Sequence, residues 1–317
     1  MVKNSKPRAG SLQFWPRKRI EKFLPSVNWQ AISSDKPELL GVIGYKVGMT
    51  SCLVKDMTPN SMTKDKRIII PVSVLEMPAM KIFSVRFYKN GIVKEEVLAE
   101  NIDKEMKKKV KLPKKKGKNI DEIKDYDDIR LIIYSKARET GIKKTPDVTE
   151  VGLGGSLEEK IKFTKEKLGK DISASEVLKE AKNVDIRGLT KGKGLQGPVK
   201  RFGIRLRQHK SEKGVRRPGS IGPWHPAHTT FRTPMAGQLG MFTRMQYNAK
   251  VVKIGNVSKE NINPGQGWKA YGNIKNEYIL LQGSVPGTEK RQLLITRVLR
   301  PTKFQAKKNY EFLKLVS

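Results

Sequence analysis

Apolar residues fall along the chain into two groups of strand-like runs. β-Branched residues dominate most of these runs, and in one of them Phe83, Val85 and Phe87 alternate with polar residues, as in a half-buried strand. The predicted strands are Val42–Met49, Ile68–Leu75, Phe83–Tyr88, Ile129–Tyr134, Val251–Ile254, Tyr278–Leu281 and Leu293–Val298. Since the two groups lie far apart in the chain, we predict a mainly β unit that is split by a long insertion.

The pattern inside the insertion changes to a helical one. Apolar residues recur at four-residue steps from Leu98 to Val110, and Pro113 follows as a stop, which predicts a helix over this segment. Two capping boxes, Ser156–Glu159 and Ser173–Glu176, predict the starts of two further helices. The insertion is therefore expected to contain α structure.

Residues 187–244 lack apolar periodicity almost entirely. They hold 13 Lys and Arg against a single acid, Glu212, together with ten Gly and five Pro. A stretch of this length without regular elements is uncommon inside a compact domain, and it cannot bury enough apolar surface to fold alone. Either it is disordered, or its packing partner is another molecule.

Composition supports a folded body with a polyanionic partner. The chain has 317 residues, a formal charge of +34 and 37% hydrophobic residues, which allows a core and about two domains. Four segments, 1–25, 103–118, 187–244 and 297–317, together carry +30 of that charge, so the remaining residues are almost neutral. An ordinary metabolic enzyme has no reason for this self-repulsion. Nucleic acid is the expected partner, and an acidic membrane surface is the alternative.

The chain has few features of a secreted or membrane protein. Cys52 is the single cysteine, so no internal disulfide and no cysteine-based zinc site is expected. No apolar signal segment and no run of about 18 apolar residues is visible. We expect a soluble, cytoplasmic protein that does not enter a membrane.

A glycine motif at Gly192–Gly197 matches the dinucleotide-binding pattern literally. That pattern needs a following helix and a later acid, whereas Pro198 and Gly203 argue against a helix here. We interpret the glycines instead as letting the main chain approach a phosphate surface, with charge from nearby lysines and arginines.

The three histidines lie in the same region, two of them beside an unusual tryptophan. His225 and His228 have no cysteine or carboxylate close in sequence to complete a metal shell or a catalytic triad. Trp224 has no periodic apolar neighbours, so an exposed ring that stacks on a base is at least as good an interpretation as core packing.

Aromatic residues and basic residues are interleaved in the first 40 residues. Phe14, Trp15, Phe23 and Trp29 surround the cluster Arg17–Arg19. This segment is either a disordered basic tail or an arm that orders on nucleic acid, where aromatic rings and arginine planes stack on bases.

Several motifs in a fixed order resemble one known family. They are Gly188–Ile204 (GLTKGKGLQGPVKRFGI), Gly219–Thr229 (GSIGPWHPAHT), Met235–Phe242, Asn248–Gly255, Leu281–Thr288, Phe14–Arg19 and Gly44–Thr50. Together they resemble the universal L-three ribosomal proteins of the large subunit, of the archaeal and eukaryotic type. The resemblance runs from about residue 14 to residue 300.

The resemblance implies a fold and a function. The fold would be mainly β with an α insertion: a closed β-barrel of the translation-protein type, an α/β insertion, a long basic non-globular loop and an N-terminal arm. The implied parts are a basic arm 1–40, barrel segments 41–95 and 245–300, an inserted region 96–186, an RNA-penetrating loop 187–244 and a basic tail 301–317. The protein would be a structural component that binds large-subunit (23S-type) rRNA, supports early assembly and reaches toward the peptidyl-transferase centre.

The expected contacts follow from this interpretation. The candidate rRNA-binding residues are Arg17, Lys18, Arg19, Lys191, Lys193, Lys200, Arg201, Arg205, Arg207, His209, Lys210, Lys213, Arg216, Arg217, Trp224, His225, His228, Arg232, Gln238 and Arg244. We expect rRNA and neighbouring ribosomal proteins as partners, no homo-oligomer, no catalytic residue, no metal site and no cofactor, although the rRNA could carry structural Mg²⁺. A general, chromatin-like nucleic-acid binder remains an alternative, and a nucleotide-binding enzyme a weaker one.

Overall fold

The computed structural model describes residues 10–113 and 119–316, and it divides the chain into two compact units. The loop unit contains the described part of Met1–Phe23 together with Leu189–Arg244, and the sheet unit contains the described part of Leu24–Gly188 and Met245–Ser317. The first nine residues of the predicted arm and the run Lys114–Lys116 lie outside the described residues.

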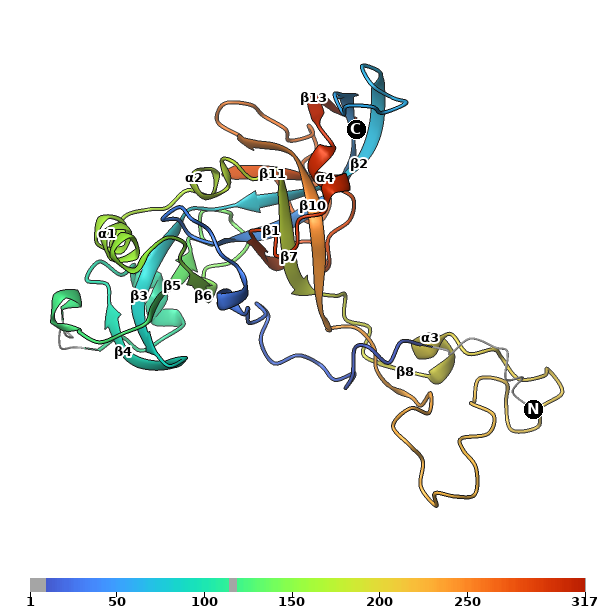
Figure 1. The fold of residues 1–317 in the computed structure, drawn as a ribbon. Coiled ribbons are helices and arrows are strands. Elements are labelled where there is room, and N and C mark those ends of the chain that lie inside the picture. Colours follow the sequence, from blue (N-terminus) through green and yellow to red (C-terminus); the bar gives the residue numbers. More distant parts are fainter. Residues whose placement is uncertain (1–9, 114–118, 317) are drawn as a thin grey trace. The chain divides into compact units, whose positions relative to one another are not determined.

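The regular elements are mostly strands (Figure 1). The strands are β1 (Gly41–Asp56), β2 (Arg67–Met77), β3 (Met80–Lys89), β4 (Ile92–Leu98), β5 (Asp128–Ser135), β6 (Val148–Gly152), β7 (Asn183–Leu189), β8 (Leu195–Gln196), β9 (Gly237–Gln238), β10 (Thr243–Asn256), β11 (Glu277–Gln282), β12 (Gln292–Thr296) and β13 (Tyr310–Val316). The helices are α1 (Leu157–Lys167), α2 (Ala174–Leu178), α3 (Pro198–Phe202) and α4 (Lys303–Lys307), with 3-10 turns at Trp29–Ala31, Lys104–Lys108 and Ile120–Glu122. The prediction of a mainly β chain is confirmed.

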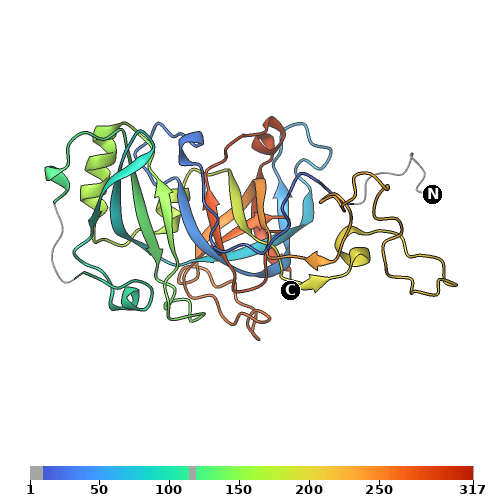
Figure 2. The same cartoon turned by 90° about the horizontal axis from the view of Figure 1, so that it is seen from below.

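Within the described residues the strands form three sheets. The seven-stranded sheet has the order β12-β7-β10-β11-β2-β1-β13, and β1 pairs with β12 as well. The four-stranded sheet has the order β4-β3-β5-β6, and β8 pairs with β9 alone. All seven strands predicted from the sequence are present, and the two larger sheets lie side by side in the sheet unit (Figure 2).

Burial along β1 shows why the larger sheet forms here. The first seven residues, from Gly41 to Val47, are all buried; β12 pairs with Gly41–Tyr45, and β2 pairs with the strand from Tyr45 onward. Toward Asp56 buried positions alternate with more exposed ones, where β13 replaces β12 as the partner. A strand covered on both faces needs continuous apolar or small residues, and a strand covered on one face needs alternation.

One hydrophobic core joins the two larger sheets. It contains Ile43 and Leu75 from the seven-stranded sheet and Ile82 and Leu131 from the four-stranded sheet. The Tyr45 hydroxyl also crosses between them, because it lies 2.7 Å from Ser135 Oγ and donates to Asp147 at 2.5 Å. Burial, followed by the Asp147 carboxylate, raises the pKa of Tyr45 well above its ordinary value, so the phenol remains protonated.

The helices predicted by the capping boxes are confirmed. Ser156 accepts a hydrogen bond from Glu159 N–H, the Glu159 carboxylate accepts one from Ser156 N–H, and α1 follows at Leu157. Ser173 Oγ caps α2 by accepting a hydrogen bond from Glu176 N–H at 3.3 Å, while the Glu176 carboxylate pairs with Lys167. Among the described residues no helix is long and apolar enough to cross a lipid bilayer.

The predicted helix over Leu98–Val110 is wrong. Leu98 ends strand β4, and only the 3-10 turn Lys104–Lys108 follows. The preceding Asn90-Gly91 pair adopts positive φ values of 50° and 76°, which closes a tight hairpin between β3 and β4. Asn-Gly is the strongest short-range hairpin signal, and the hairpin that follows it places Leu98 in a strand and not in a helix.

Several segments differ in detail from the sequence expectation. The pairing of β3 with β4 and β5 places Phe83–Tyr88 in the four-stranded sheet, so the change of sheet comes between Met77 and Met80. Trp29, expected in a basic arm, is buried in the core of the sheet unit. Residues 301–317, expected as a basic tail, contain α4 and the strand β13, which pairs with β1.

Candidate nucleic-acid interface

The two limbs of the basic loop are hydrogen-bonded to each other at their base. Thr190 N–H donates to Phe242 O at 3.0 Å, Lys193 N–H to Leu239 O at 2.9 Å, and Leu239 N–H to Gly194 O at 2.9 Å. The expectation of a stretch without regular elements is therefore wrong at this end, where β8, α3 and β9 occur. From Gly203 to Ala236 the chain forms only turns and bends.

Two glycines permit this close approach of the limbs. Gly240 has a φ of +78°, and a Cβ atom there would lie only 1.9 Å from Lys191 O. A Cβ atom on Gly192 would lie 3.0 Å from the Met241 side chain. At these positions the glycine-rich sequence lets main chain approach main chain. Gly194 and Gly197 of the same motif have open space around them.

Helix α3 supplies the small core of the loop unit, although the sequence argued against a helix here. Pro198 occupies its first turn, and Gly203 ends it with a left-handed φ of 69°. Proline at a helix start and glycine just after a helix end are helix boundary signals. Pro198 and Gly203 therefore mark the two ends of α3 and do not prevent the helix. The helix buries Phe202, whose ring stacks with Trp15 at a centroid distance of 6.2 Å.

Arg17 and Arg201 connect the N-terminal arm to the loop by reciprocal hydrogen bonds. Arg17 Nη1 donates to Arg201 O at 3.1 Å, and Arg201 Nη2 donates to Arg17 O at 3.4 Å. Both guanidinium groups also lie near the Phe202 ring, at 4.3 Å and 5.1 Å from its centroid. The arm is therefore held by an arginine–aromatic cluster, which consists of Trp15, Arg17, Arg201 and Phe202.

Arg201 makes further contacts to the returning limb. Its Nε donates to Gln238 O at 3.0 Å, and its Nη1 donates to Met235 O at 3.0 Å and to Ala236 O at 3.4 Å. Burial lowers the pKa of Arg201 from its ordinary value, although the group stays cationic at neutral pH. Arg201 is predicted to contact RNA, but its hydrogen bonds go to main-chain carbonyl groups of its own chain.

Gln238 and Arg244 are also engaged within the loop unit. Gln238 Nε2 donates to Leu239 O and to Gly240 O, at 3.3 Å and 3.1 Å. The Arg244 guanidinium lies 4.0 Å from the centroid of Phe14 and donates to Thr243 O. Burial lowers the pKa of Arg244 as well. Half-buried positions thus distinguish Arg17, Arg201, Gln238 and Arg244 from the other predicted contacts.

The remaining basic candidates of the loop are exposed to solvent. Exposed side chains are those of Lys191, Lys193, Lys200, Arg205, Arg207, His209, Lys210, Lys213, Arg216, Arg217 and Arg232, and from the arm those of Lys18 and Arg19. Glu212 is exposed too, and it forms no ion pair with any residue that the structure describes. The loop therefore presents cations whose charge its own carboxylate does not cancel.

The far end of the loop is the most exposed part of the described chain. Residues 221–230 are all exposed, and Trp224 shows 88% of its surface to solvent. His225 and His228 lie in the same turn, where His228 N–H donates to Pro226 O at 2.8 Å. The Thr233 hydroxyl donates to Ile221 O at 3.0 Å and closes the turn. A bare indole at such a tip is available for stacking on a flat partner.

Charges in the sheet unit are arranged differently, since many of them are paired. Lys81 Nζ lies 3.0 Å from Asp103 Oδ1, and Lys136 Nζ lies 2.5 Å from Asp171 Oδ2. The loop unit shows no comparable carboxylate partners among its described residues. A polyanion would therefore meet less competition from protein acids on the loop unit than on these parts of the sheets.

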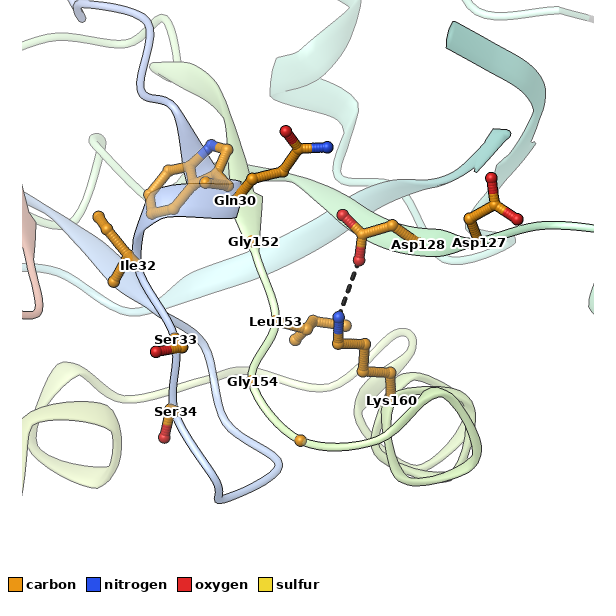
Figure 3. A pocket seen from close by; sticks show the side chains of 12 residues that line it. Gln30, Ile32, Ser33, Ser34, Asp127, Asp128, Gly152, Leu153, Gly154 and Lys160 are labelled. Carbon is orange, nitrogen blue, oxygen red and sulfur yellow. Dashed lines mark hydrogen bonds and ion pairs between the residues drawn. The ribbon is translucent and has the colours of Figure 1, made fainter. Parts of the chain in front are cut away.

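A cavity of about 330 Å³ lies beside Trp29 in the sheet unit (Figure 3). Its lining includes Asp127, Asp128 and Lys160, and Lys160 Nζ lies 2.8 Å from Asp128 Oδ1. The cavity thus holds one paired lysine and two acids, which does not suit an anion. No group of three or more His, Cys, Asp or Glu side chains in the described part of the chain could hold a metal ion.

Comparisons with known proteins agree with the resemblance in the motifs. The sequence model of the family described as Ribosomal protein L3 matches residues 1–317. The chain is 41% identical to the large ribosomal subunit protein uL3 of Methanobrevibacter smithii over 317 residues, covering 95% of this chain and 94% of the relative. Identity to the uL3 proteins of Archaeoglobus fulgidus and Methanocaldococcus jannaschii is 39% and 38%, over 95% and 94% of this chain and 94% and 92% of those proteins.

Proposed function

The chain belongs to the ribosomal protein L3 family, and from this premise we propose that it is a structural rRNA-binding component of the large ribosomal subunit in the cytoplasm. The observation that carries the proposal is the contrast between the two units. The loop unit exposes a row of cations without carboxylate partners and a bare Trp224, whereas many charges of the sheet unit are paired.

The proposed roles of the loop cations, the loop shape and the loop tip follow from that contrast. Exposed lysines and arginines of the loop neutralise phosphates and supply affinity, and the shape of the loop supplies register on folded RNA. The tip with Trp224 extends toward the peptidyl-transferase region, as in the family, and stacks on an unpaired base. The protein supports early assembly and takes no catalytic part. Its partners are rRNA and neighbouring ribosomal proteins, and it works as a single copy without a cofactor.

The sheet unit serves as the scaffold in this proposal. Neighbouring strands pair in the order β1, β2, β11, β10, β7 and β12, and β12 pairs again with β1. We propose that these six strands close a barrel of the translation-protein type, with β13 added at β1. A closed barrel leaves few free strand edges.

Salt dependence of binding tests the electrostatic part of the proposal. Nine exposed loop cations have no ion-pair partner among the described residues: Lys191, Lys193, Lys200, Arg205, Arg207, Lys210, Lys213, Arg216 and Arg217. If about six of them meet phosphates, log K for a large-subunit rRNA fragment should fall with log salt at a slope of about −4 to −5. A slope near zero would rule this account out.

Specificity separates the proposal from its alternatives. The full-length protein should co-sediment with large subunits and protect defined rRNA helices from chemical probing. Binding of duplex DNA as tightly as rRNA would favour a general nucleic-acid binder. Retention and turnover of a nicotinamide cofactor would favour an enzyme instead.

A further inference from the structure

The segment between β4 and β5 carries a group of lysines that the proposed function does not use. Five of the eight residues from Lys104 to Lys111 are lysines. Their side chains are all exposed, and no ion pair or hydrogen bond joins their ammonium groups to a residue that the structure describes. We call this group the lysine turn, and it consists of Lys104, Lys107, Lys108, Lys109 and Lys111.

Apolar side chains fix the lysine turn to the four-stranded sheet. Met106, in the middle of the turn, is fully buried in a cluster that includes Phe83 and Tyr134. Ile102 and Leu112, which flank the turn, pack against the same cluster. The apolar positions of this segment therefore face the sheet. The lysines between them are carried by a backbone that is held at three points.

The two acids of the segment are engaged elsewhere and do not neutralise its lysines. Asp103 Oδ1 lies 3.0 Å from Lys81 Nζ, and Asp103 Oδ2 accepts a hydrogen bond from the Tyr134 hydroxyl at 3.0 Å. Glu105 Oε1 lies 3.0 Å from Arg138 Nη1. The charges of the segment are therefore separated, because its carboxylates pair with cations from neighbouring segments while its ammonium groups are exposed to solvent.

Other lysines around this sheet have acidic partners, in contrast to the lysine turn. Lys94 Nζ lies 3.2 Å from Asp125 Oδ2, and Lys160 Nζ lies 2.8 Å from Asp128 Oδ1. Within the lysine turn a 3-10 rise of ~2 Å per residue spreads the backbone of the turn over only about 10 Å, which is close to the Debye length at physiological salt. The unpaired ammonium groups therefore repel one another, and a polyanion along the turn would relieve this repulsion.

The composition of the turn favours phosphates over bases as its partner. Residues 103–112 contain no aromatic side chain and no arginine. Recognition of unpaired bases uses aromatic rings or guanidinium planes that stack on them, whereas lysine binds phosphate as a point charge. The lysine turn therefore suits the backbone of a paired RNA segment, in contrast to the loop tip with its exposed Trp224.

We infer that the lysine turn is a second RNA-binding surface of the protein and that it holds the phosphate backbone of a double-helical rRNA segment. The inference rests on the proposed function for the identity of the RNA. It goes beyond that function because it gives the sheet unit an rRNA contact of its own. The inserted region then packs on the sheet with one side and binds RNA with the other.

Removal of charge from the turn tests the inference. The variant Lys107→Gln/Lys108→Gln/Lys109→Gln loses three exposed ammonium groups, while Met106 and Asp103 keep their contacts. Full-length protein is titrated with intact large-subunit rRNA at several salt concentrations. The salt slope of the variant should be smaller than that of the wild type by about 2–3, since each lost phosphate contact lowers it by about 0.7–1.

Three separated lysines of the inserted region provide the matched control. The variant Lys162→Gln/Lys170→Gln/Lys179→Gln removes the same formal charge from exposed positions. Its salt slope should change by less than 1, because these lysines are not clustered. The melting temperatures of both variants should stay close to that of the wild type, since surface substitutions have little effect on stability.

Hydroxyl-radical probing of the rRNA backbone locates the contact. The turn variant should lose protection in one paired segment and keep the protections that the loop unit provides, whereas the control variant should keep them all. Loss of protection in an unpaired segment alone would overturn the assignment to a double helix.

Two other results would overturn the inference and leave the proposed function standing. One is an unchanged salt slope and unchanged protection in the turn variant, with normal rRNA binding by the wild type. The other is normal binding of free rRNA by a turn variant that is lost from assembled subunits, because the turn would then contact a neighbouring protein. If the wild type does not prefer rRNA to duplex DNA, the proposed function fails. The salt slopes of the two variants on duplex DNA then still decide whether the turn binds a phosphate backbone.

Discussion

Replacing Arg201 with lysine separates a structural arginine from a phosphate-binding one. The substitution keeps the positive charge at this position. It removes the planar fork that donates to Gln238 O and Met235 O at 3.0 Å and, more weakly, to Arg17 O and Ala236 O at 3.4 Å. A lysine ammonium is a compact point charge on a flexible stem and cannot reach carbonyls from three chain segments at once.

The size of the effect follows from the two shorter hydrogen bonds. Because Arg201 is only half-buried, we assign about 1 kcal/mol to each, the value typical of an ordinary hydrogen bond and below the range for hydrogen bonds of charged groups. The loss of about 2 kcal/mol corresponds to roughly a 30-fold fall in the ratio of ordered to disordered loop base. If RNA binds the ordered form, the apparent dissociation constant rises by up to the same factor.

The assay is a titration of the rRNA fragment at several salt concentrations, with Lys200→Ala as the neighbouring control. Lys200 is exposed on the same helix, so its loss should reduce the salt slope by about 1. Arg201→Lys should weaken binding and leave the slope unchanged. Hydrogen exchange at the amides of Lys193 and Leu239 should become faster in Arg201→Lys alone. Wild-type affinity and wild-type exchange in Arg201→Lys would refute the structural role.

Three further outcomes follow from the structure. Gly240→Ala should destabilise the base of the loop by at least about 1–2 kcal/mol, because φ is +78° there and the new Cβ would lie 1.9 Å from Lys191 O. Proteolysis between residues 203 and 236 should therefore become faster, and resistance equal to that of the wild type would contradict this. Trp224→Ala should leave incorporation into subunits largely intact but impair function on the A-site side, since one stacking contact contributes only ~1–3 kcal/mol; failure to assemble would count against the proposal. Cys52 should resist thiol reagents at pH 8 until the protein unfolds, because burial raises its pKa to about 11 and leaves roughly one thiol in a thousand ionised; rapid labelling of the native protein would disprove it.

Local sequence signals were sufficient for seven of the strands and for two helices. β-Branched runs such as Ile68–Leu75 and the capping boxes at Ser156 and Ser173 act over a few residues, and the structure contains the elements they predict. The segment Leu98–Val110 shows the limit of such signals. Its apolar spacing fits a helix, but pairing of β4 with β3 depends on the Asn90-Gly91 turn outside the segment.

Sheet membership and pairing were not readable from the sequence. Phe83–Tyr88 and Ile68–Leu75 have similar apolar content, yet β3 and β2 lie in different sheets, because β2 pairs with β1 and β11 whereas β3 pairs with β4 and β5. The last strand illustrates the same point. Tyr310–Val316 looked like part of a charged tail, but alternation of Tyr310 and Phe312 with Glu311 allows it to pair with β1.

The candidate interface was predictable as a segment but not residue by residue. Net charge located the loop, since 13 of its 58 residues are basic, but charge alone does not distinguish a cation that faces a partner from one that holds the fold. Arg17 and Arg201 were predicted as RNA contacts from their charge, and the structure shows both donating to main-chain carbonyls.

The chemistry of arginine explains why these particular cations turn inward. The loop unit has few apolar residues, and Phe202 is one of the few that it buries. A guanidinium group can satisfy several carbonyls and still lie flat against an aromatic ring, so Arg17 and Arg201 supply packing that leucine or valine would supply elsewhere. The consequence is quantitative: the salt slope of RNA binding should reflect the exposed cations of the loop, and not its full formal charge of +12.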